Sequence, residues 1–465
     1  MKMLHFYDAL TAGANSPEGQ VLRFDSACLT EDSEAVNSTF IQARDDLFIE
    51  PAGIEYTDLY DHLLDQGISE YEWSRQAESL FLRPHTVHIG LGSSSEIDSY
   101  IRNALYRSLS LYPNTCLPRH NQFLDIATLV RAIHYLRPEV FGWDIGAAVK
   151  KDALLRDRLL RMHEFEDENR ARQLVKIFAH LDSVAHDFIS FAVRNAAPDR
   201  SKDLLGLENG ALSDMASANP CVVTHQSIPN ERHLGAFMPI AVDISYPDIV
   251  YLADLSCDLS ELCDPDTPAL DNLVRRRPDQ FMAPIVRVNL SRLPFIAPLA
   301  TVRPSDAQRL SLDIGKINDN IALLRAADQM AMRLLDEPII GDTRMPADVD
   351  YRMLAGEYHV ADMNLIKRLH ASDFSRWPEL LPEAHDNRIL ELGRRVLLRN
   401  RPDLLNDSDQ RLWDRKLKGI YCGTNVTPDR VESILKAAED SVKATLGMKG
   451  PVSHANRLRR LLGSP

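Results

Sequence analysis

The chain has 465 residues, a formal net charge of −14 at pH 7, 45% hydrophobic residues and 26% charged residues. This composition is ordinary for a globular protein, and the length suits two to four domains of about 100–200 residues each. The negative charge excludes a protein coated over its whole surface with nucleic acid, although it leaves room for one basic groove.

The cysteine pattern favours a reducing compartment. Six cysteines are scattered without a CxxC pair, at Cys28, Cys116, Cys221, Cys257, Cys263 and Cys422. This spacing argues against a zinc site and against a disulfide framework. The sequence also shows no signal peptide and no apolar run long enough to span a membrane, so we expect a cytoplasmic protein.

The first 190 residues mix strand and helix patterns. Short strand patterns come first (MLHFY, VLRFDSACL and DLFIEP), and the strand HTVHIGLG then leads through three serines into the helix EIDSYIRNALYRSL. A helix at FLDIATLVRAIHYLRPE ends at Pro138, and two more helical stretches follow between Ala153 and Arg194. Strands followed by strand–helix alternation predict an α/β or α+β domain.

The remaining chain changes character twice. Residues 195–220 are rich in Gly, Ser, Ala, Asp and Pro and are typical of a linker. Short strands then predict a small β-barrel or sheet: CVVTHQSI, AFMPIAVDI, DIVYLADL and APIVRVNLSRLPFIAPL. A second punctuated linker at 337–350 precedes helical patterns only.

Charge is distributed unevenly along the chain. From Asp386 to Pro465 there are 16 Lys and Arg against 10 Asp and Glu, so this segment carries +6 and the rest carries −20. An acidic body with a basic C-terminal part suits a polyanion held in one channel. The simpler alternative is a solvated helical surface.

Several stretches resemble exonuclease I, the bacterial family that degrades single-stranded DNA from its 3′ end. The match runs from PIVRVNLSRLPFIAPLATVRPSDAQRL to DNIALLR in the middle of the chain, and through RILELGRRVLLRN and QRLW near the end. The helix ending in LRPE and the opening DALTAGAN extend the resemblance in the same order over nearly the whole chain.

The resemblance implies an α+β multidomain protein. We expect a ribonuclease H-like exonuclease domain at 1–197, an SH3-like β-barrel domain with flanking helices at 198–340, and a helical domain at 341–465. In the family these domains form a clamp around single-stranded DNA, so only the inner wall has to be basic.

The family's chemistry is two-metal phosphodiester cleavage, in which several carboxylates converge on two Mg²⁺ ions and a histidine serves near the water. Its pattern is Asp-x-Glu on the first strand, an Asp that opens a helix, and a His shortly before a last Asp. In YDALTAGAN, Asp8 matches the first acid and Leu10 replaces the Glu. A rival frame puts Phe6 at the Asp and Asp8 at the Glu, so one acid is missing either way. The alternative is that Asp8 is a turn residue.

The other two acid positions are also altered. An ungapped match puts Ile97 at the helix-opening Asp, with Glu96 and Asp98 on either side. These acids are either substitutes or solvated first-turn residues favoured by the helix dipole. His163 precedes Asp167 by four residues, one fewer than in the family, and on a helix that spacing would put both on one face. The rival interpretation is coincidence in an acidic segment.

We therefore predict catalytic ancestry for Asp8, Asp98, His163 and Asp167, with Asp8 and Asp167 as metal ligands. Mg²⁺ is the expected cofactor of an active enzyme, and no cofactor is expected if hydrolysis is lost. Predicted contacts to nucleic acid are Arg292, Arg395, Arg399 and Tyr358, with Tyr351, Arg287 and Arg275-Arg276-Arg277 as further candidates.

Three hypotheses follow. The first is an exonuclease I-like protein that binds single-stranded DNA in a clamp, with 3′→5′ exonuclease ancestry and weakened or lost hydrolysis. The second is an active Mg²⁺-dependent enzyme of DNA repair with a rearranged site. The third is an interaction module, because the resemblance implies contact with the acidic tail of single-stranded-DNA-binding protein. We expect a monomer without a membrane partner.

Overall fold

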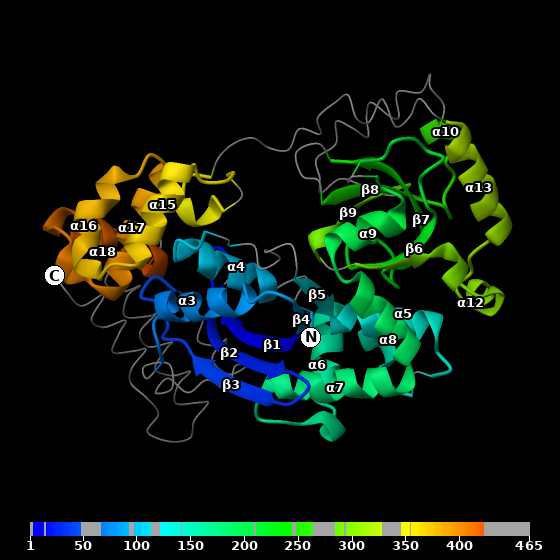
Figure 1. The fold of residues 1–465 in the computed structure, drawn as a ribbon, viewed down its shortest axis with the longest axis horizontal. Coiled ribbons are helices and arrows are strands. Elements are labelled where there is room, and N and C mark those ends of the chain that lie inside the picture. The colour runs from blue at the N-terminus through cyan, green and yellow to red at the C-terminus, as the bar shows by residue number, and fades with distance from the viewer. Residues whose placement is uncertain are drawn as a thin grey trace.

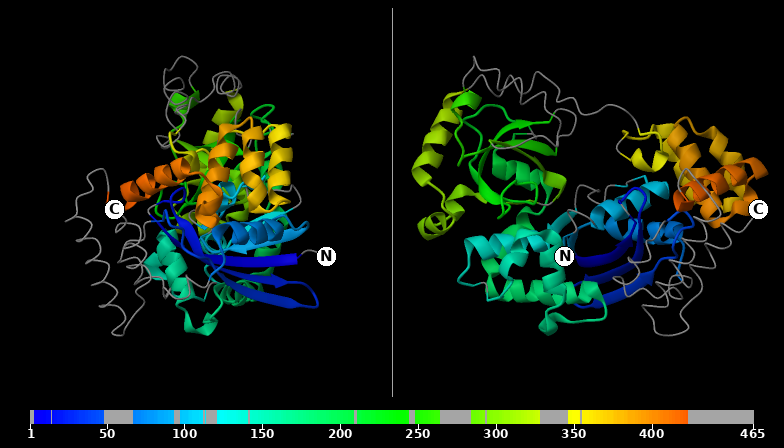
Figure 2. Two further views of the ribbon diagram at one scale, coloured as in Figure 1. Left: turned by 90° about the vertical axis from the view of Figure 1, so that its left-hand side faces the viewer. Right: turned by 180° about the vertical axis from the view of Figure 1, so that it is seen from behind.

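The computed structural model describes residues 3–13, 15–47, 67–92, 97–111, 113, 121–140, 142–208, 211–243, 248–263, 284–292, 294–327, 346–353 and 355–422. These residues form two five-stranded sheets and a C-terminal group of helices (Figure 1). The second sheet and the C-terminal helices stand at opposite ends of the first sheet and its helices, and on the same side of them (Figures 1 and 2). The described parts therefore form an open arch.

The first sheet has the strand order β3-β2-β1-β4-β5. Its strands β1 to β3 are antiparallel, whereas β4 and β5 run parallel to β1. This arrangement confirms the predicted ribonuclease H-like fold. The strands are β1 (Met3–Ala12), β2 (Gln20–Leu29), β3 (Glu34–Phe40), β4 (Thr86–Gly90) and β5 (Gln122–Asp125).

Helices cover both faces of this sheet. On one face, α3 (Glu70–Phe81) and α4 (Asp98–Arg107) bury a cluster that includes Trp73 and Tyr7. Helix α3 begins at a capping box, in which Ser69 and Glu72 satisfy each other's backbone N–H groups. On the other face lie α5 (Ile126–Leu136), α6 (Asp152–Leu160), α7 (Arg170–Val184) and α8 (His186–Asn195).

Some local predictions for this domain were wrong. The segment FLDIATL is not helical from its start, because residues 122–125 pair with β4 and the Asp125 carboxylate caps α5 by accepting from the Ala127 N–H. Three helices follow rather than two. Strand β3 was not predicted, and most of DLFIEP lies outside the described residues.

The second sheet is fully antiparallel, with the order β10-β6-β7-β8-β9. It confirms the SH3-like domain. Its strands are β6 (Cys221–Thr224), β7 (Leu234–Val242), β8 (Ile249–Asp254), β9 (Ile285–Asn289) and β10 (Phe295–Pro298), with helices α9 (Pro198–Leu205), α10 (Ser260–Cys263), α12 (Pro304–Arg309) and α13 (Ile314–Ala326).

Residues 195–220 do not form a linker, contrary to the sequence prediction. Helix α9 occupies 198–205, and Leu205, Leu212 and Met215 are buried in the core of the SH3-like domain. Small and polar residues here mark turns within a packed segment, because the apolar residues between them have a sheet to bury against.

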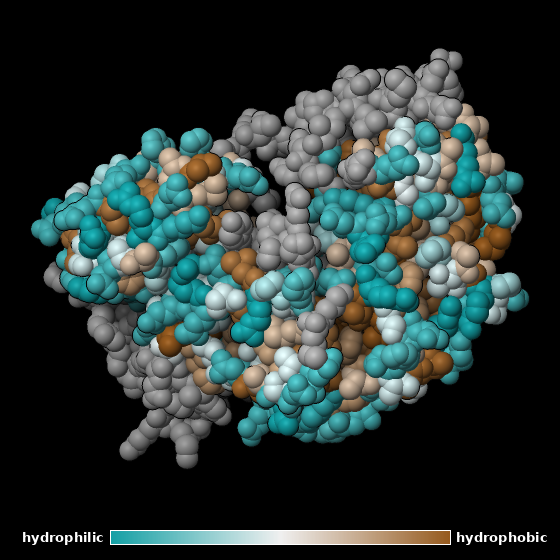
Figure 3. Space-filling model, in the orientation of Figure 1, coloured by the Kyte–Doolittle hydropathy of each residue, from teal (hydrophilic) through white to brown (hydrophobic). Residues whose placement is uncertain are grey.

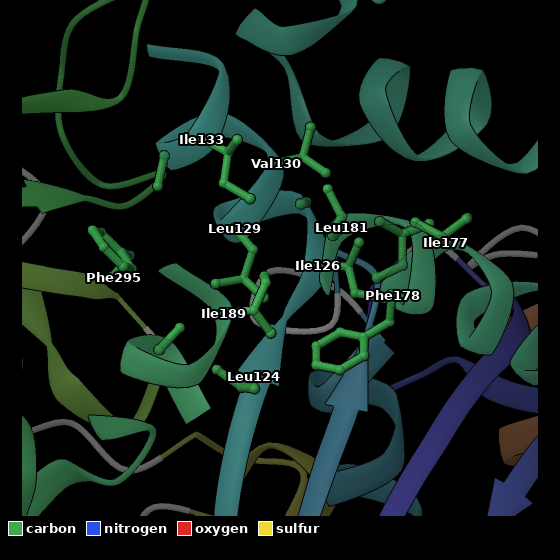
Figure 4. Packing of buried hydrophobic residues seen from close by; sticks show 14 of the residues in the cluster. Leu124, Ile126, Leu129, Val130, Ile133, Ile177, Phe178, Leu181, Ile189 and Phe295 are labelled. Carbon is green, nitrogen blue, oxygen red and sulfur yellow. The ribbon is translucent and has the colours of Figure 1, made fainter. Parts of the chain in front are cut away.

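The two sheets share a continuous apolar junction. Figure 4 shows Leu129 and Ile133 of α5 and Ile189 of α8, with Phe295 of β10 approaching from the second sheet. The Phe295 ring also stacks on Phe188, with centroids 4.7 Å apart. Such burial fixes the SH3-like domain on the nuclease-like domain.

The C-terminal helices pack on the opposite end. They are α15 (Val360–His370), α16 (Trp377–Leu380), α17 (Asn387–Asn400) and α18 (Asp407–Cys422). Their core surrounds Trp377 and takes in Tyr106 from α4, whose hydroxyl donates to the Val349 carbonyl at 3.0 Å. Hydrophilic residues cover most of the face of these helices in Figure 3. Within the described part of the chain, no helix has the length and apolar character needed to cross a membrane.

Candidate active site

Asp8, the first predicted acid, is bound by an arginine. It lies on β1 and is fully buried. Arg156 of α6 reaches it with both terminal nitrogens: Nη1 lies 2.6 Å from Oδ1, and Nη2 donates to Oδ2 at 2.7 Å. Nη1 also donates to the Leu91 carbonyl at 2.9 Å, which orients the guanidinium group. The Arg156 guanidinium thus faces both oxygens of Asp8, with a hydrogen bond to Oδ2 and an ion-pair contact to Oδ1.

A second carboxylate, Asp25, lies beside Asp8 and was not predicted. The two residues are direct partners in the β1–β2 register, so their side chains share one face of the sheet. Asp25 accepts from Arg23 Nε at 2.9 Å and from the Arg170 backbone N–H at 2.9 Å. The Arg170 guanidinium lies 3.9 Å from Asp8. The strand pairing could have revealed Asp25 only if the hairpin register had been known.

The two positions where the expected acids are missing serve as packing positions. Leu10 packs against the buried Leu22 and Leu47. Ile97, which is 5% exposed, belongs to the core between the sheet and α3–α4. Neither residue offers a metal ligand, and both contribute buried apolar surface.

Asp98 is separated from Asp8 by the sheet. It accepts from the Tyr7 hydroxyl at 2.7 Å and lies 3.7 Å from Arg102. Adjacent residues on a strand point to opposite faces, so Tyr7 directs Asp98 to the face away from Asp8. Burial raises the pKa of Asp98, although Arg102, the Tyr7 hydroxyl and Arg292 oppose this effect. The structure does not bring Asp98 and Asp8 together.

His163 and Asp167 do not share a helix face, contrary to the prediction. His163 starts a short 3-10 turn (His163–Phe165), and α7 begins only at Arg170, after Asp167. The His163 side chain is 97% exposed and lies 3.5 Å from Glu166. Asp167 pairs with Lys176 at 2.9 Å; burial raises its pKa, but Lys176 and the Asn169 N–H outweigh this and lower it.

These residues do not fit a two-metal centre. In the ranges that the structure describes, no three His, Cys, Asp or Glu side chains lie close enough together to hold a metal ion. Two carboxylates do meet, at Asp8 and Asp25, but arginines occupy their oxygens. Glu96 lies outside the described residues.

Two of the predicted phosphate contacts are engaged in buried ion pairs. Arg399 binds Asp46 through Nη2 at 2.6 Å and Nε at 3.1 Å, and its side chain is 7% exposed. Arg395 lies 2.6 Å from both Asp348 and Asp350. Their surroundings argue against both as phosphate contacts, because each would have to give up an ion pair with a carboxylate that is at most 7% exposed, Asp46 for Arg399 and Asp350 for Arg395.

The two remaining predicted nucleic-acid contacts, Tyr358 and Arg292, stay predictions. The Tyr358 ring lies under the Arg388 guanidinium, 4.6 Å from its centroid, so one stacking face is occupied. Arg292 sits in the turn before β10, and its positive charge acts on the pKa of Asp98 across the two domains. Tyr351 donates to Glu18, and Arg275-Arg276-Arg277 lie outside the described residues.

Comparison with known proteins agrees with the fold. A family model described as the exonuclease I SH3-like domain matches residues 209–336. Exodeoxyribonuclease I of Buchnera aphidicola subsp. Baizongia pistaciae is 24% identical over 457 residues, covering 90% of this chain and 88% of that protein. The similarity to the exonuclease I family thus extends over most of the chain. A structure of Escherichia coli exonuclease I in complex with a dA16 oligonucleotide has a TM-score of 0.78 at 18% identity, with 99% of each chain covered. A structure of SSB/exonuclease I in complex with an inhibitor has a TM-score of 0.79 at 19% identity, with 100% and 99% covered.

The chain therefore has the fold of exonuclease I, and its Asp8 is paired with Arg156. Arg156 lies 148 residues from Asp8 in the sequence. Sequence reasoning missed it because no local pattern links an arginine on α6 to an acid on β1.

Proposed function

We propose that this chain holds single-stranded DNA on the exonuclease I scaffold and hydrolyses it slowly or not at all. The observation that carries the proposal is the buried Asp8–Arg156 ion pair, in which the first acid of the expected metal site is the partner of an arginine. Leu10 and Ile97 support it, because both are packed apolar side chains where the family pattern has acids.

DNA binding is supported by the family and by the shape of the chain. The E. coli relative has been solved with a dA16 oligonucleotide, and the match covers 99% of this chain. The three described parts form an arch (Figure 1), and the charge of Arg292 in the SH3-like domain acts on Asp98 in the nuclease-like domain. We take the predicted boundaries 1–197, 198–340 and 341–465 as the working limits of the three domains.

The test is a paired binding and hydrolysis assay with 5′-labelled oligo-dT. Binding is measured by fluorescence anisotropy in EDTA, and shortening of the strand is followed on gels in Mg²⁺ or Mn²⁺. We expect binding, with hydrolysis on the order of 10³-fold or more below E. coli exonuclease I assayed alongside, since each ~1.4 kcal/mol of lost transition-state stabilisation is tenfold in rate.

Each outcome separates the hypotheses. Rapid shortening that an Asp8→Ala variant abolishes would refute the proposal and show a working, rearranged metal site. Binding without shortening supports it. Neither binding nor shortening would refute it and favour the interaction hypothesis, to be tested by pull-down with the C-terminal tail of single-stranded-DNA-binding protein, since a relative has been solved as SSB/exonuclease I.

A further inference from the structure

Three arginines and two carboxylates meet where β1, β2, α6 and α7 come together. Asp8 and Asp25 lie side by side on the sheet, and Arg23, Arg156 and Arg170 surround them. Three cations against two anions leave a local charge of +1. The start of α7 at Arg170 adds the positive end of a helix dipole.

The excess charge lies on the outside of this arginine cluster. The Asp8 and Asp25 side chains are 0% and 2% exposed, whereas Arg156, Arg23 and Arg170 are 19%, 21% and 28% exposed. A molecule that approaches the cluster therefore meets guanidinium groups and not carboxylates. This is the opposite of a metal site, which presents oxygen ligands.

The Arg170 guanidinium group has N–H donors available for a ligand. Within the described residues, its guanidinium group has Asp8 as its carboxylate neighbour at 3.9 Å and makes no hydrogen bond. Burial lowers the pKa of Arg170; attraction by Asp8 opposes this, and repulsion from Arg156 and Arg23 adds to it. The cluster is thus short of negative charge, and an anion placed against Arg170 and Arg156 would relieve that repulsion.

We propose that Arg156 and Arg170 bind a terminal phosphate of a DNA strand directly, at the position where the family pattern puts its first metal-binding acid. The planar guanidinium fork matches phosphate oxygens in a bidentate manner. A terminal phosphomonoester carries about −1.5 to −2 charges at pH 7, more than an internal phosphodiester, so it gains most from an unbalanced arginine pair. The inference rests on the proposed function, because the DNA-binding scaffold delivers the 3′ end to this place.

The experiment compares oligo-dT with a 3′-phosphate, a 5′-phosphate or hydroxyls at both ends, in EDTA and by anisotropy. We expect the 3′-phosphate strand to bind about five- to tenfold more tightly than the other two strands. Arg170→Gln should abolish this preference, measured as the ratio of the affinities for the 3′-phosphate and hydroxyl-ended strands. Arg170 is the better probe, because Arg156→Ala leaves the buried Asp8 without its main partner. Arg161→Gln, next to α6 in an exposed pair with Asp157, is the matched control and should keep the preference.

Equal binding of all three strands would overturn this inference while the proposed function stands. A preference that persists in Arg170→Gln would also overturn it. A preference for any phosphorylated end, equal for 3′ and 5′, would refute the directional assignment. Competition by free inorganic phosphate at concentrations that leave the hydroxyl-ended strand bound would support the cluster as the site. Failure to bind any strand would refute the proposed function and the inference together.

Discussion

Arg399 fastens the C-terminal helices to the nuclease-like domain, so its removal should destabilise the protein. Its Nη2 lies 2.6 Å from Asp46 and 3.5 Å from Asp350. The Asp46 and Asp350 side chains are 4% and 7% exposed. Burial raises the pKa of Asp46, but attraction by Arg399 and Arg44 outweighs it and lowers that pKa well below its usual range. The Arg399–Asp46 pair is therefore charged and shielded from solvent, and it joins segments that are 353 residues apart in the sequence.

The magnitude follows from this burial. Breaking a buried ion pair by removing one partner costs about 3–5 kcal/mol when the remaining charge stays unpaired. After Arg399→Ala, Arg44 still lies 3.3 Å from Asp46 and Arg395 lies 2.6 Å from Asp350, so the low end of this range, about 3 kcal/mol, applies. Arg401 lies just beyond the end of α17 and pairs with Asp403, but these side chains are 49% and 59% exposed, so this pair contributes little to stability. At about 2–4 °C per kcal/mol, Arg399→Ala should lower Tm by about 6–12 °C, and Arg401→Ala should lower it much less.

Thermal unfolding followed by tryptophan fluorescence suits this test, because Trp413 lies 5.6 Å from the Arg399 guanidinium. A double variant, Asp46→Asn with Arg399→Met, removes both charges and should recover part of the lost stability. Equal Tm shifts for Arg399→Ala and Arg401→Ala would refute the reasoning. So would a double variant that is no more stable than Arg399→Ala alone.

Three further predictions concern buried groups and metal. His5 and His88 share a buried contact, with Nδ1 atoms 2.7 Å apart, and burial lowers the pKa of both, to about 3 for His88. Both folded-state pKa values lie below the unfolded value of about 6.5, so the stability is fully present above about pH 6.5 and falls as the pH drops toward 3. Tm measured from pH 8 to 5 should therefore decline below about pH 6.5. The decline should be smaller in a His5→Gln, His88→Gln variant. Arg107 is fully buried and makes two hydrogen bonds to Glu70 and three to the carbonyls of residues 16, 17 and 19. Arg107→Lys should therefore lower the free energy of unfolding, measured in urea, by about 3 kcal/mol or more. A decrease of less than about 1 kcal/mol would contradict this. Finally, 10 mM Mg²⁺ should leave Tm within about 1 °C of its value in EDTA. Tight binding of Mg²⁺ to the native state would raise Tm, and the described residues contain no group of three His, Cys, Asp or Glu that could hold the ion.

The sequence was sufficient for the architecture because the relevant signals are local. Short apolar runs separated by Pro, Asp and Asn marked most strands of the second sheet, and family motifs supplied the order of the domains. Strand β3 was not predicted because EAVNSTF is a mostly exposed edge strand, so its sequence carries no pattern of buried apolar residues. Strand β5 was taken for helix because its four buried residues run directly into the apolar α5.

The site was harder to predict because its state depends on long-range partners. The spacing of His163 and Asp167 suggested one helix face, but a turn separates them. Asp98 lies next in sequence to the matching position, yet the Tyr7 hydroxyl holds it on the other side of the sheet. The missing acids were visible in the sequence as Leu10 and Ile97, whereas the arginine that holds Asp8 was not.

Removing Arg156 should not by itself restore hydrolysis. Arg156→Ala would free Asp8 and leave Asp25 beside it, but two carboxylates on one sheet face fall short of the ligand set that two metal ions need. Leu10→Glu would add an acid at a packed position, and burying its carboxylate would cost stability unless a metal ion compensated it. Ile97→Asp would add no ligand beside Asp8, because Ile97 lies in the core between the sheet and α3–α4. We therefore expect Mg²⁺ neither to raise Tm nor to support strand shortening in the Arg156→Ala variant. Mg²⁺-dependent shortening by the Arg156→Ala variant alone would show that the acids already present suffice and that the arginine is a removable block.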